Sequence, residues 1–481
     1  MKKQIFLFAF ALICVVTSNA QTRYLDQIFS SVDTTMNITY GTNIDVITGM
    51  PASLDLKLDL YEPAGDTATN RPVVIVVHGG SFLPVPINNY CTGTKTDSQI
   101  VVMCTELAKY GYVVASIDYR MGWNPVSGDQ DIRTGTYLNA YYRSVQDIRN
   151  AVRFFRWSVD NGNPYNITND KFSIIGEETG GFSAVGAGSL DSYNEISLPK
   201  FINPSTMQSY IDTSLSGNSY GTEVRPLNMA NYPTYSSDVN FIGNLGGAVG
   251  DSTWIEAGEP PVVSLHTPSN PFIPYSFGAV IVQTTGDFLI NVSGSYHLQQ
   301  KANSLGNNDV YINAGLNDNI TQIANAKNDG VNGLFPFYRP SVETSPWHWW
   351  DTTCISNSNS LMTNPDMSES KALAYTDTIL WYLVPRMAYA NDLVSTSSIS
   401  ETDLSKSVLI FPNPASEIIE VYVENNIMHS IALIDITGRV VYNAEINENK
   451  TILNINEFDP GVYFVSVSTE YGLIVKKMII E

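Results

Sequence analysis

Hydrophobic positions follow two alternating periods from about residue 50 to about residue 390. Runs of β-branched residues, and stretches in which apolar and polar residues alternate, predict strands at 54–63, 71–80, 112–120, 172–176, 259–267 and 309–314. Apolar residues at helical spacing predict helices at 98–112, 141–157, 294–308 and 371–390. Because strands and helices alternate, we expect an α/β protein with a doubly wound, mostly parallel sheet and helices on both faces.

The alternation breaks between residues 190 and 250, which are rich in Tyr, Asn, Ser and Pro. Two interpretations stay open for this stretch. It is either a long surface excursion or a cap over the mouth of a pocket, with aromatic rings that face a planar or sugar-like ligand. The tyrosines concerned are Tyr193, Tyr210, Tyr220, Tyr232 and Tyr235.

Both ends of the chain differ from the middle. Residues 1–20 carry two lysines, an apolar run and the small-residue sequence Ser-Asn-Ala, which is the pattern of a secretory signal peptide. Residues 391–407 are polar and Ser/Thr-rich, as expected of a linker, and 408–481 contain short alternating strands that predict a small all-β sandwich. The main domain is then expected at 21–390, with no transmembrane segment after the signal.

The net charge limits the kinds of binding partner, and the cysteine and histidine content limits the possible disulfides and metal sites. The chain has 26 basic and 47 acidic residues, and loss of the two leader lysines leaves a net charge of −23. Such a balance argues against nucleic acid and against anionic membranes. Export permits a disulfide, but Cys91, Cys104 and Cys354 allow three pairings and leave one thiol over. With five histidines and no zinc spacing, we expect no metal and no cofactor.

A glycine-rich turn follows the predicted strand at 172–176. The sequence Gly-Glu-Glu-Thr-Gly from Gly176 to Gly180 has the frame of a nucleophile elbow, G-x-Nuc-x-G, and a helix of small residues comes next. In serine hydrolases the central position of this frame holds serine, whereas here it holds Glu178. The motif thus predicts the skeleton of a nucleophilic enzyme with an unusual residue at its tip.

The C-terminal segment resembles a known sorting signal. The stretches FPNPASEIIEVYV, IDITGRVVY, FDPGVYFVSVS and KKMII are similar to the C-terminal sorting domain of the bacterial type IX secretion system. The resemblance covers roughly residues 408–481. It implies a bacterium of the Bacteroidetes type, recognition by the type IX machinery, and a protein that is secreted or attached to the outer-membrane surface.

The central region resembles α/β-hydrolases of the carboxylesterase and feruloyl-esterase-like kind over roughly residues 50–390. Three stretches carry the resemblance: VVIVVHGGSF, QDIRNAVRFFRW and PPVVSLHTPSNPFIPY. It implies a Ser-His-Asp triad, into which Glu178 falls at the nucleophile, Asn270 at the acid and His348 at the base. It also implies an oxyanion hole made by the backbone N–H groups of Gly79, Gly80 and Thr179.

Two of the three triad slots hold the wrong residue type. A glutamate is a weak nucleophile toward esters and is one methylene longer than the aspartate used by other hydrolases of this fold, and a misplacement of about 1 Å can cost about 100-fold in rate. Asparagine supplies no charge to an imidazolium, and Asp-to-Asn at a triad acid can cost about 10,000-fold. His348, in SPWHWWD, is either the base or a member of an aromatic surface cluster.

Three hypotheses follow from the sequence. The first is a degenerate hydrolase that binds a small-molecule ester or a carbohydrate-linked ligand without cleaving it. The second is an active hydrolase that uses Glu178 or another nucleophile. The third is a structural cell-surface protein whose pocket has no role.

Overall fold

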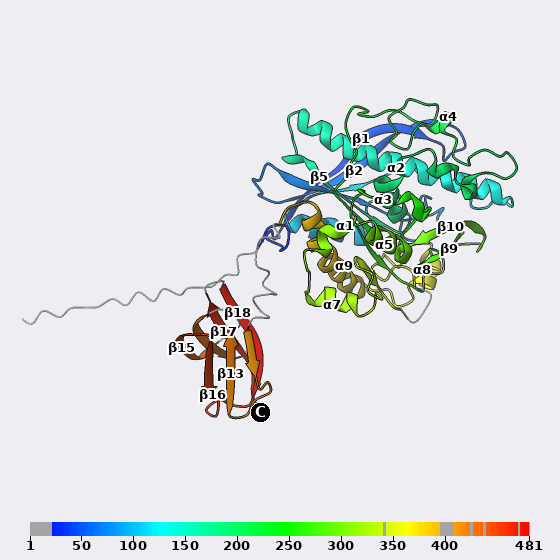
Figure 1. The fold of residues 1–481 in the computed structure, drawn as a ribbon. Helices are drawn as coiled ribbons and strands as arrows, with labels where there is room; N and C mark the ends of the chain where they lie inside the picture. The colour runs from blue at the N-terminus through cyan, green and yellow to red at the C-terminus, as the bar shows by residue number, and fades with distance from the viewer. Residues whose placement is uncertain are drawn as a thin grey trace, which may run out of the picture. The chain divides into compact units, whose positions relative to one another are not determined.

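The computed structural model describes residues 22–339, 343–394, 408–423, 427–435, 439–469 and 472–480. The chain divides into two compact units, one that runs to Leu393 and one that begins at Val394. The predicted signal peptide at 1–20 lies outside the described residues, as does the predicted linker from residue 395 to residue 407. Figure 1 shows the fold of each unit.

An eight-stranded sheet forms the centre of the first unit, in the order β1-β2-β4-β3-β5-β6-β8-β11. The first two strands pair antiparallel, and all the pairs from β4 to β11 are parallel. The predicted doubly wound, mostly parallel sheet is therefore confirmed. Its strands are β1 (Val32–Asp45), β2 (Ala52–Pro63), β3 (Arg71–Val77), β4 (Val113–Ile117), β5 (Ile167–Glu177), β6 (Phe241–Leu245), β8 (Val262–His266) and β11 (Leu334–Pro336).

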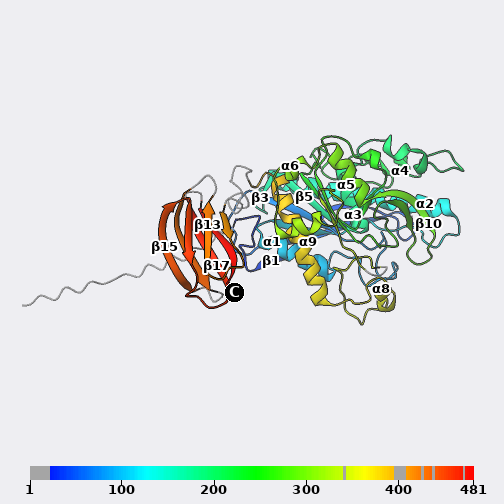
Figure 2. The same cartoon turned by 60° about the horizontal axis from the view of Figure 1, so that its bottom comes forward.

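Helices cover both faces of this sheet (Figures 1 and 2). Val73, Ile75 and Val77 of β3 belong to one core with α2 and α3, whereas Val74 and Val76 belong to a second core with α1 and α9. The continuous β-branched run predicted this, because a strand buried on both faces has no polar alternate positions. The helices are α1 (Ser98–Lys109), α2 (Gln130–Asp160), α3 (Thr179–Ser189), α5 (Ser295–Ser304) and α9 (Glu369–Ala390).

Shorter elements complete the first unit. A three-stranded sheet has the order β7-β10-β9, with β7 (Ala248–Val249), β9 (Phe277–Ile281) and β10 (Phe288–Gly294). The short helices are α4 (Thr213–Ser216), α6 (Asp309–Ile312), α7 (Asn319–Asn325) and α8 (Asn357–Thr363), and 3₁₀ turns lie at Glu195–Ser197, Pro199–Phe201 and Ser252–Trp254.

The predicted irregular stretch 190–250 is wrong at its end, where Phe241–Leu245 form β6 and Ala248–Val249 form β7. The part up to residue 240 runs along α2. Gln146 on that helix donates hydrogen bonds to the carbonyls of Ser216 and Asn218, and Arg153 donates to the carbonyl of Tyr220. Long side chains of one helix therefore hold a segment that has little regular structure of its own.

Several predictions about elements of the first unit were wrong or incomplete. The stretch 309–314 forms helix α6 and not a strand, because Asn308 and Asp309 begin a turn that burial of Tyr311 completes. The last strand of the sheet is β11, which is too short to give a periodic signal. Strand β1 was not predicted, because its first half is mostly exposed and lacks apolar alternation.

The second unit is the predicted small β-sandwich. One sheet has the order β12-β13-β16 and the other β15-β14-β17-β18. Val421, Ile431 and Val465 are among the buried residues between them. The strands are β12 (Val408–Phe411), β13 (Ile418–Val423), β14 (Met428–Asp435), β15 (Val440–Glu448), β16 (Lys450–Asn454), β17 (Gly461–Thr469) and β18 (Gly472–Ile480).

Candidate active site

The predicted elbow is a sharp turn between β5 and α3. Strand β5 ends at Glu177, α3 begins at Thr179, and Glu178 between them has φ 50° and ψ −114°. A side chain on Gly176 would lie 2.0 Å from the carbonyl oxygen of Gly180, and one on Gly180 would lie 2.3 Å from that of Val77. Strand, turn and helix pack so closely that only glycine fits at both positions. The turn has the strained form of a nucleophile elbow, with Glu178 at its tip.

The Glu178 carboxylate is held at that tip by a hydroxyl. Its Oε1 accepts a hydrogen bond of 2.7 Å from Oγ of Ser345, which follows β11. Its Oε2 lies against Gly79, where a Cβ atom would stand 2.9 Å away. Glu178 lines a small cavity of about 20 Å³ together with Tyr90, Ser345 and His348.

His348 pairs with the residue before the tip. Its Nε2 lies 3.1 Å from Oε2 of Glu177, and both side chains are buried. Burial alone would lower the pKa of His348, but Glu177 and, less strongly, Glu178 and Asp97 raise it to about 9. Burial would raise the pKa of Glu177, yet His348, Gln99 and the Gly79 N–H lower it. The pair is thus an ion pair at neutral pH.

The predicted oxyanion donors lie around the same turn. The Gly79 N–H donates to Oε1 of Glu177 at 3.4 Å, so it faces a buried carboxylate and not an open cavity. Gly80 has φ 99° and lies so close to Gly93 that a Cβ atom would be 2.6 Å from its Cα. Thr179 begins α3 and lines a second, larger cavity.

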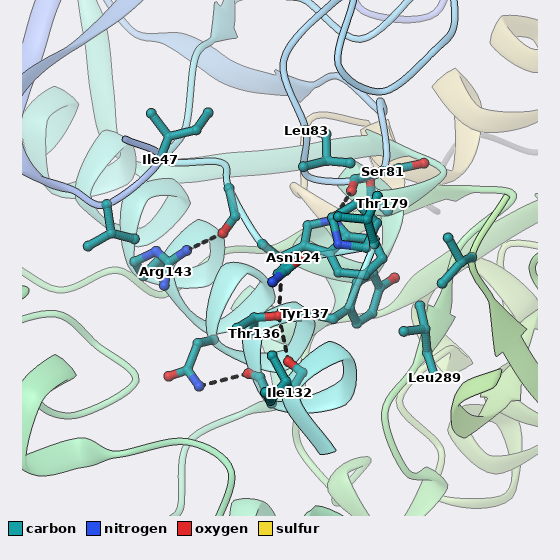
Figure 3. Close-up of a pocket in the computed structure, with 18 of the residues that line it drawn as sticks. Ile47, Ser81, Leu83, Asn124, Ile132, Thr136, Tyr137, Arg143, Thr179 and Leu289 are labelled. Atoms are coloured by element: carbon teal, nitrogen blue, oxygen red, sulfur yellow. Dashed lines mark hydrogen bonds between the residues drawn. The ribbon is translucent and has the colours of Figure 1, made fainter. Parts of the chain in front are cut away.

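That larger cavity has a volume of about 1150 Å³. Figure 3 shows part of its wall, which α2 and the segments after β3 and β4 provide. Trp123, Tyr137, Tyr210 and Phe272 give it aromatic surface, and the Trp123 indole N–H donates to the carbonyl of Ser81 at 2.7 Å. Five tyrosines of the stretch 190–250 were named above as candidates to face a ligand. Among the described lining residues of this cavity, one of the five, Tyr210, is present.

The first unit matches a known protein family over most of its length. Residues 58–301 match the family model described as BD-FAE. The chain belongs to the BD-FAE family. Its fold is that of the esterase-like α/β-hydrolases, as the resemblance had implied. Residues 409–481 match the secretion system C-terminal sorting domain, so the chain is exported to the cell surface or beyond through type IX secretion.

Two solved structures are similar to this chain at low identity. Esterase 2 of Thermogutta terrifontis in its apo form is 15% identical with a TM-score of 0.36, covering 74% of this chain and 96% of that one. A truncated carbohydrate esterase from gut microbiota is 16% identical with a TM-score of 0.34, covering 58% and 86%. Likenesses this distant say nothing about chemistry. No curated relative matches the sequence, and no helix among the described residues is long and apolar enough to cross a membrane.

Asn270 lies in a tight turn of this BD-FAE unit. Its Oδ1 accepts hydrogen bonds from the N–H groups of Phe272 and Ile273, and its own N–H donates to the carbonyl of Thr267. No hydrogen bond joins Asn270 to His348 in the described part of the chain. The Asn270 amide therefore stabilises its own loop, and His348 takes its carboxylate partner from β5.

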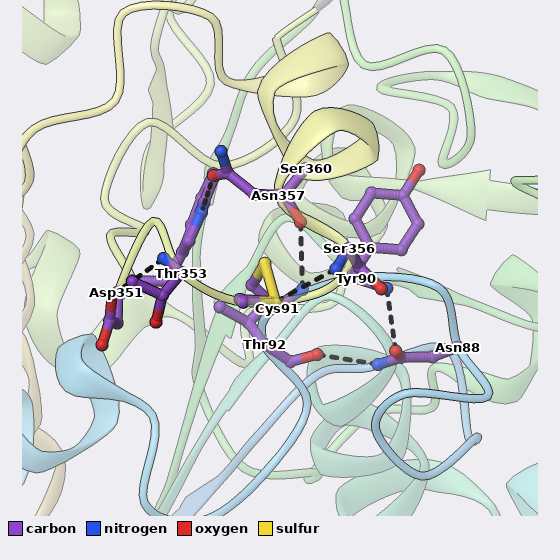
Figure 4. Close-up of a disulfide and its surroundings, with 11 residues drawn as sticks. Asn88, Tyr90, Cys91, Thr92, Asp351, Thr353, Ser356, Asn357 and Ser360 are labelled. Carbon is purple, nitrogen blue, oxygen red and sulfur yellow. Dashed lines mark hydrogen bonds between the residues drawn. A yellow bond between two sulfur atoms is a disulfide. The ribbon is translucent and has the colours of Figure 1, made fainter.

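A disulfide fixes the loop that carries His348 (Figure 4). Cys91 bonds to Cys354 across 263 positions of sequence, which resolves the three open pairings, and Cys104 is a buried free thiol. The Cys91 N–H donates to Oγ of Ser360, beside the bond. The loop after β3 and the loop after β11, which line the small cavity beside Glu178, are thus tied together.

Two residues of the site were missed by sequence reasoning in the roles they have here. Glu177 ends β5 one position before the elbow tip, and its sequence context gave no sign that it would pair with His348. Ser345 carries no motif, and its contact with Glu178 joins positions 167 residues apart. Sequence spacing holds no signal for such a contact.

Proposed function

We propose that the BD-FAE unit is a degenerate hydrolase that binds a small ester-like or carboxylic ligand in the large cavity without cleaving it by the serine mechanism. The observation that carries this is the residue at the elbow tip, which is Glu178 and not a serine.

The charge at the tip opposes ester cleavage. Acyl transfer develops a negative oxygen beside the elbow, which oxyanion donors normally stabilise. Unit charges about 4 Å apart repel by about 4 kcal/mol at an effective dielectric of about 20. An anionic Glu178 would therefore cancel the stabilisation from one donor, and the Gly79 N–H is already engaged by Glu177.

The direction of His348 supports the same proposal. A base must reach the proton of the nucleophile, directly or through one water. His348 directs Nε2 to Glu177, and the raised pKa of His348, about 9, keeps it protonated at neutral pH. A protonated imidazole accepts no proton.

One observation favours a second candidate, an active hydrolase. The cavity of about 20 Å³ beside Glu178 is polar and has room for one water molecule. In this hypothesis Glu178 acts as a general base toward that water. It predicts ester turnover that Glu178→Gln abolishes, whereas the binding proposal predicts no turnover.

A structural surface protein is the third candidate, and the size of the cavity counts against it. Pockets of about 300–1,000 Å³ with aromatic walls are typical of ligand sites, and this cavity, at about 1150 Å³, is slightly larger. A unit that only displays a surface has no need of one.

Covalent labelling tests the loss of a nucleophilic serine. The purified protein would be incubated with a fluorophosphonate, and its intact mass measured. We expect no added mass for the native protein, and one label for Glu178→Ser if the turn still strains its tip residue. A label on the native protein at any serine, Ser345 included, would overturn the proposal.

A further inference from the structure

We propose that the ligand of the large cavity carries a carboxylate, which binds the guanidinium of Arg143. The inference rests on the proposed function, because it takes the cavity to be a binding site. It adds a chemical class of ligand and the orientation in which that ligand lies.

Arg143 is a built part of the cavity wall. It projects from α2, is only 4% exposed, and lines the cavity. Its Nη2 donates a hydrogen bond of 2.7 Å to the carbonyl of Gly122, which fixes the side chain as Figure 3 shows. Its Nε, by contrast, is buried and has no hydrogen-bond partner. Buried donors are usually paired, and Arg143 is distinguished from the other arginines with an unpaired nitrogen by its place on the wall of this cavity.

The arginines near Arg143 have other partners, although Arg133 and Arg149 of α2 also each keep one buried nitrogen without a hydrogen bond. Arg120, from the segment after β4, makes an ion pair with Asp147 at 2.8 Å, and both side chains are fully buried. Arg149 lies over the ring of Tyr220, and Arg153 donates to two backbone carbonyls. No acidic side chain lies within 4.0 Å of Arg143 in the described part of the chain. Its charge is compensated only at longer range.

Arg143 nevertheless keeps its charge at neutral pH. Burial, followed by the nearby charge of Arg120, lowers its pKa to about 10, while Asp147 and Asp45 act in the opposite direction. A buried cation without an adjacent anion is costly unless a partner arrives. A carboxylate matches the planar guanidinium in geometry and supplies that partner.

The other charges on the wall do not replace the missing anion. Asp131 is half-buried and accepts hydrogen bonds from the hydroxyls of Tyr210 and Ser205. Asp212 is exposed and caps α4. Water and salt screen such charges much more than they screen a buried one. Among the described lining residues, Arg143 is the one basic side chain.

The other lining residues indicate the chemical character of the part of the ligand that lies beyond its carboxylate. Ile47, Leu83, Ile132 and Leu289 add aliphatic surface to the aromatic rings. At the elbow end, Thr179 lines the cavity, and no basic side chain among the described lining residues offers a site for a second anion there. The ligand is therefore an amphipathic monocarboxylate with an apolar or aromatic body. Its carboxylate lies at α2, and its uncharged end lies toward Thr179.

The test compares two probes of the same shape, trans-cinnamate and its neutral amide, trans-cinnamamide. Binding to the full protein would be measured at pH 7 by calorimetry and by tryptophan fluorescence, since Trp123 lines the cavity. A hydrogen bond to a charged group contributes enough for a preference of about tenfold or more. We expect native protein to prefer cinnamate to that extent.

Arg143→Gln should bring the two affinities to within about threefold and leave cinnamamide binding unchanged. The matched control is Arg225→Gln, an exposed arginine that does not line the cavity and should keep the native preference. Should Arg143→Gln fail to fold by circular dichroism, Arg143→Lys serves instead, and a preserved but weaker preference for cinnamate is expected.

The outcomes separate this inference from the proposed function. Equal or tighter binding of cinnamamide by native protein overturns the carboxylate site alone, and so does an unchanged preference in folded Arg143→Gln. If neither probe binds, both the carboxylate site and the binding proposal fall. If native protein hydrolyses esters while the Arg143 preference persists, only the loss of catalysis is wrong.

Discussion

Nε2 of His348 lies 3.1 Å from Oε2 of Glu177, so the histidine of the site is paired with the residue that precedes the elbow tip. Gln99 donates to the other oxygen of that carboxylate at 2.9 Å. The elbow strand thus holds the imidazole by a buried charge, where a hydrolase would leave it free to take a proton. This arrangement joins β5 to the loop after β11 and gives His348 a role in stability.

Unfolding at several pH values tests the pair. His348 has a folded pKa of about 9 against 6.5 for the free side chain, so its contribution is full below pH 6.5 and is lost as pH rises through 9. Glu177 has a lowered pKa, so its contribution is present above pH 4.5 and is lost as pH falls through the lowered value. The contribution of this pair to the free energy of unfolding should therefore be largest at about pH 4.5–6.5.

Glu177→Gln should cost about 3 kcal/mol at pH 6 and flatten the decline toward pH 9, because it leaves a buried imidazolium unpaired. Urea unfolding followed by tryptophan fluorescence is a suitable measurement, since all seven tryptophans precede residue 394 and report on the first unit. Asp170→Asn, an exposed acid, is the control. A native-like pH profile in Glu177→Gln would contradict the ion pair.

The sequence predicted those features that repeat locally. Continuous apolar runs marked β3, and Gly176 with Gly180 marked the elbow, because a sharp turn and a buried strand leave short-range signatures. The partners of the site could not be read in this way. Ser345 and His348 reach Glu178 and Glu177 across more than 160 residues, and only the packing of β11 beside β8 brings them there.

Arg143 was missed for a different reason. Helix α2 carries arginines on several successive turns. Their spacing in the sequence does not show whether a given side chain contacts a carboxylate, a carbonyl or a cavity. Only the folded unit separates the paired Arg120 from Arg143 with its unused Nε.

The elbow glycines should be needed for folding whatever the tip residue does. Gly180→Ala places a methyl group 2.3 Å from the carbonyl oxygen of Val77, and should lower the free energy of unfolding by about 3 kcal/mol or more. Gly128→Ala is the matched control, since a Cβ there meets no atom within 4 Å. Equal stability of the two variants by urea unfolding would mean that strand and helix are not packed as described.

Loss of the disulfide should loosen the His348 loop. The double variant Cys91→Ser/Cys354→Ser should reduce the free energy of unfolding by about 2–4 kcal/mol, because the bond closes a long loop in the unfolded chain. Dithiothreitol should destabilise the native protein by a similar amount and leave the double variant unaffected. A peptide mass map that joins Cys104 to either cysteine would contradict the pairing.

Removal of the sorting domain should stop surface delivery. A chain without residues 409–481 should be found inside the outer membrane of a host with type IX secretion, because the machinery has nothing to recognise. Cell fractionation and immunoblotting, with the full chain as reference, measure this. Equal amounts of both chains at the surface or in the medium would show that the segment is not required.

The most direct test of the central claim is ester hydrolysis by the native protein beside Glu178→Gln, with short-chain nitrophenyl esters and a feruloyl ester at pH 7. Both proteins should hydrolyse these esters at the rate of buffer alone, since our proposal takes Glu178 as the residue in the nucleophile slot and His348 is held by Glu177. Turnover by the native protein that falls about 100-fold or more in Glu178→Gln would contradict the account and make Glu178 a catalytic residue.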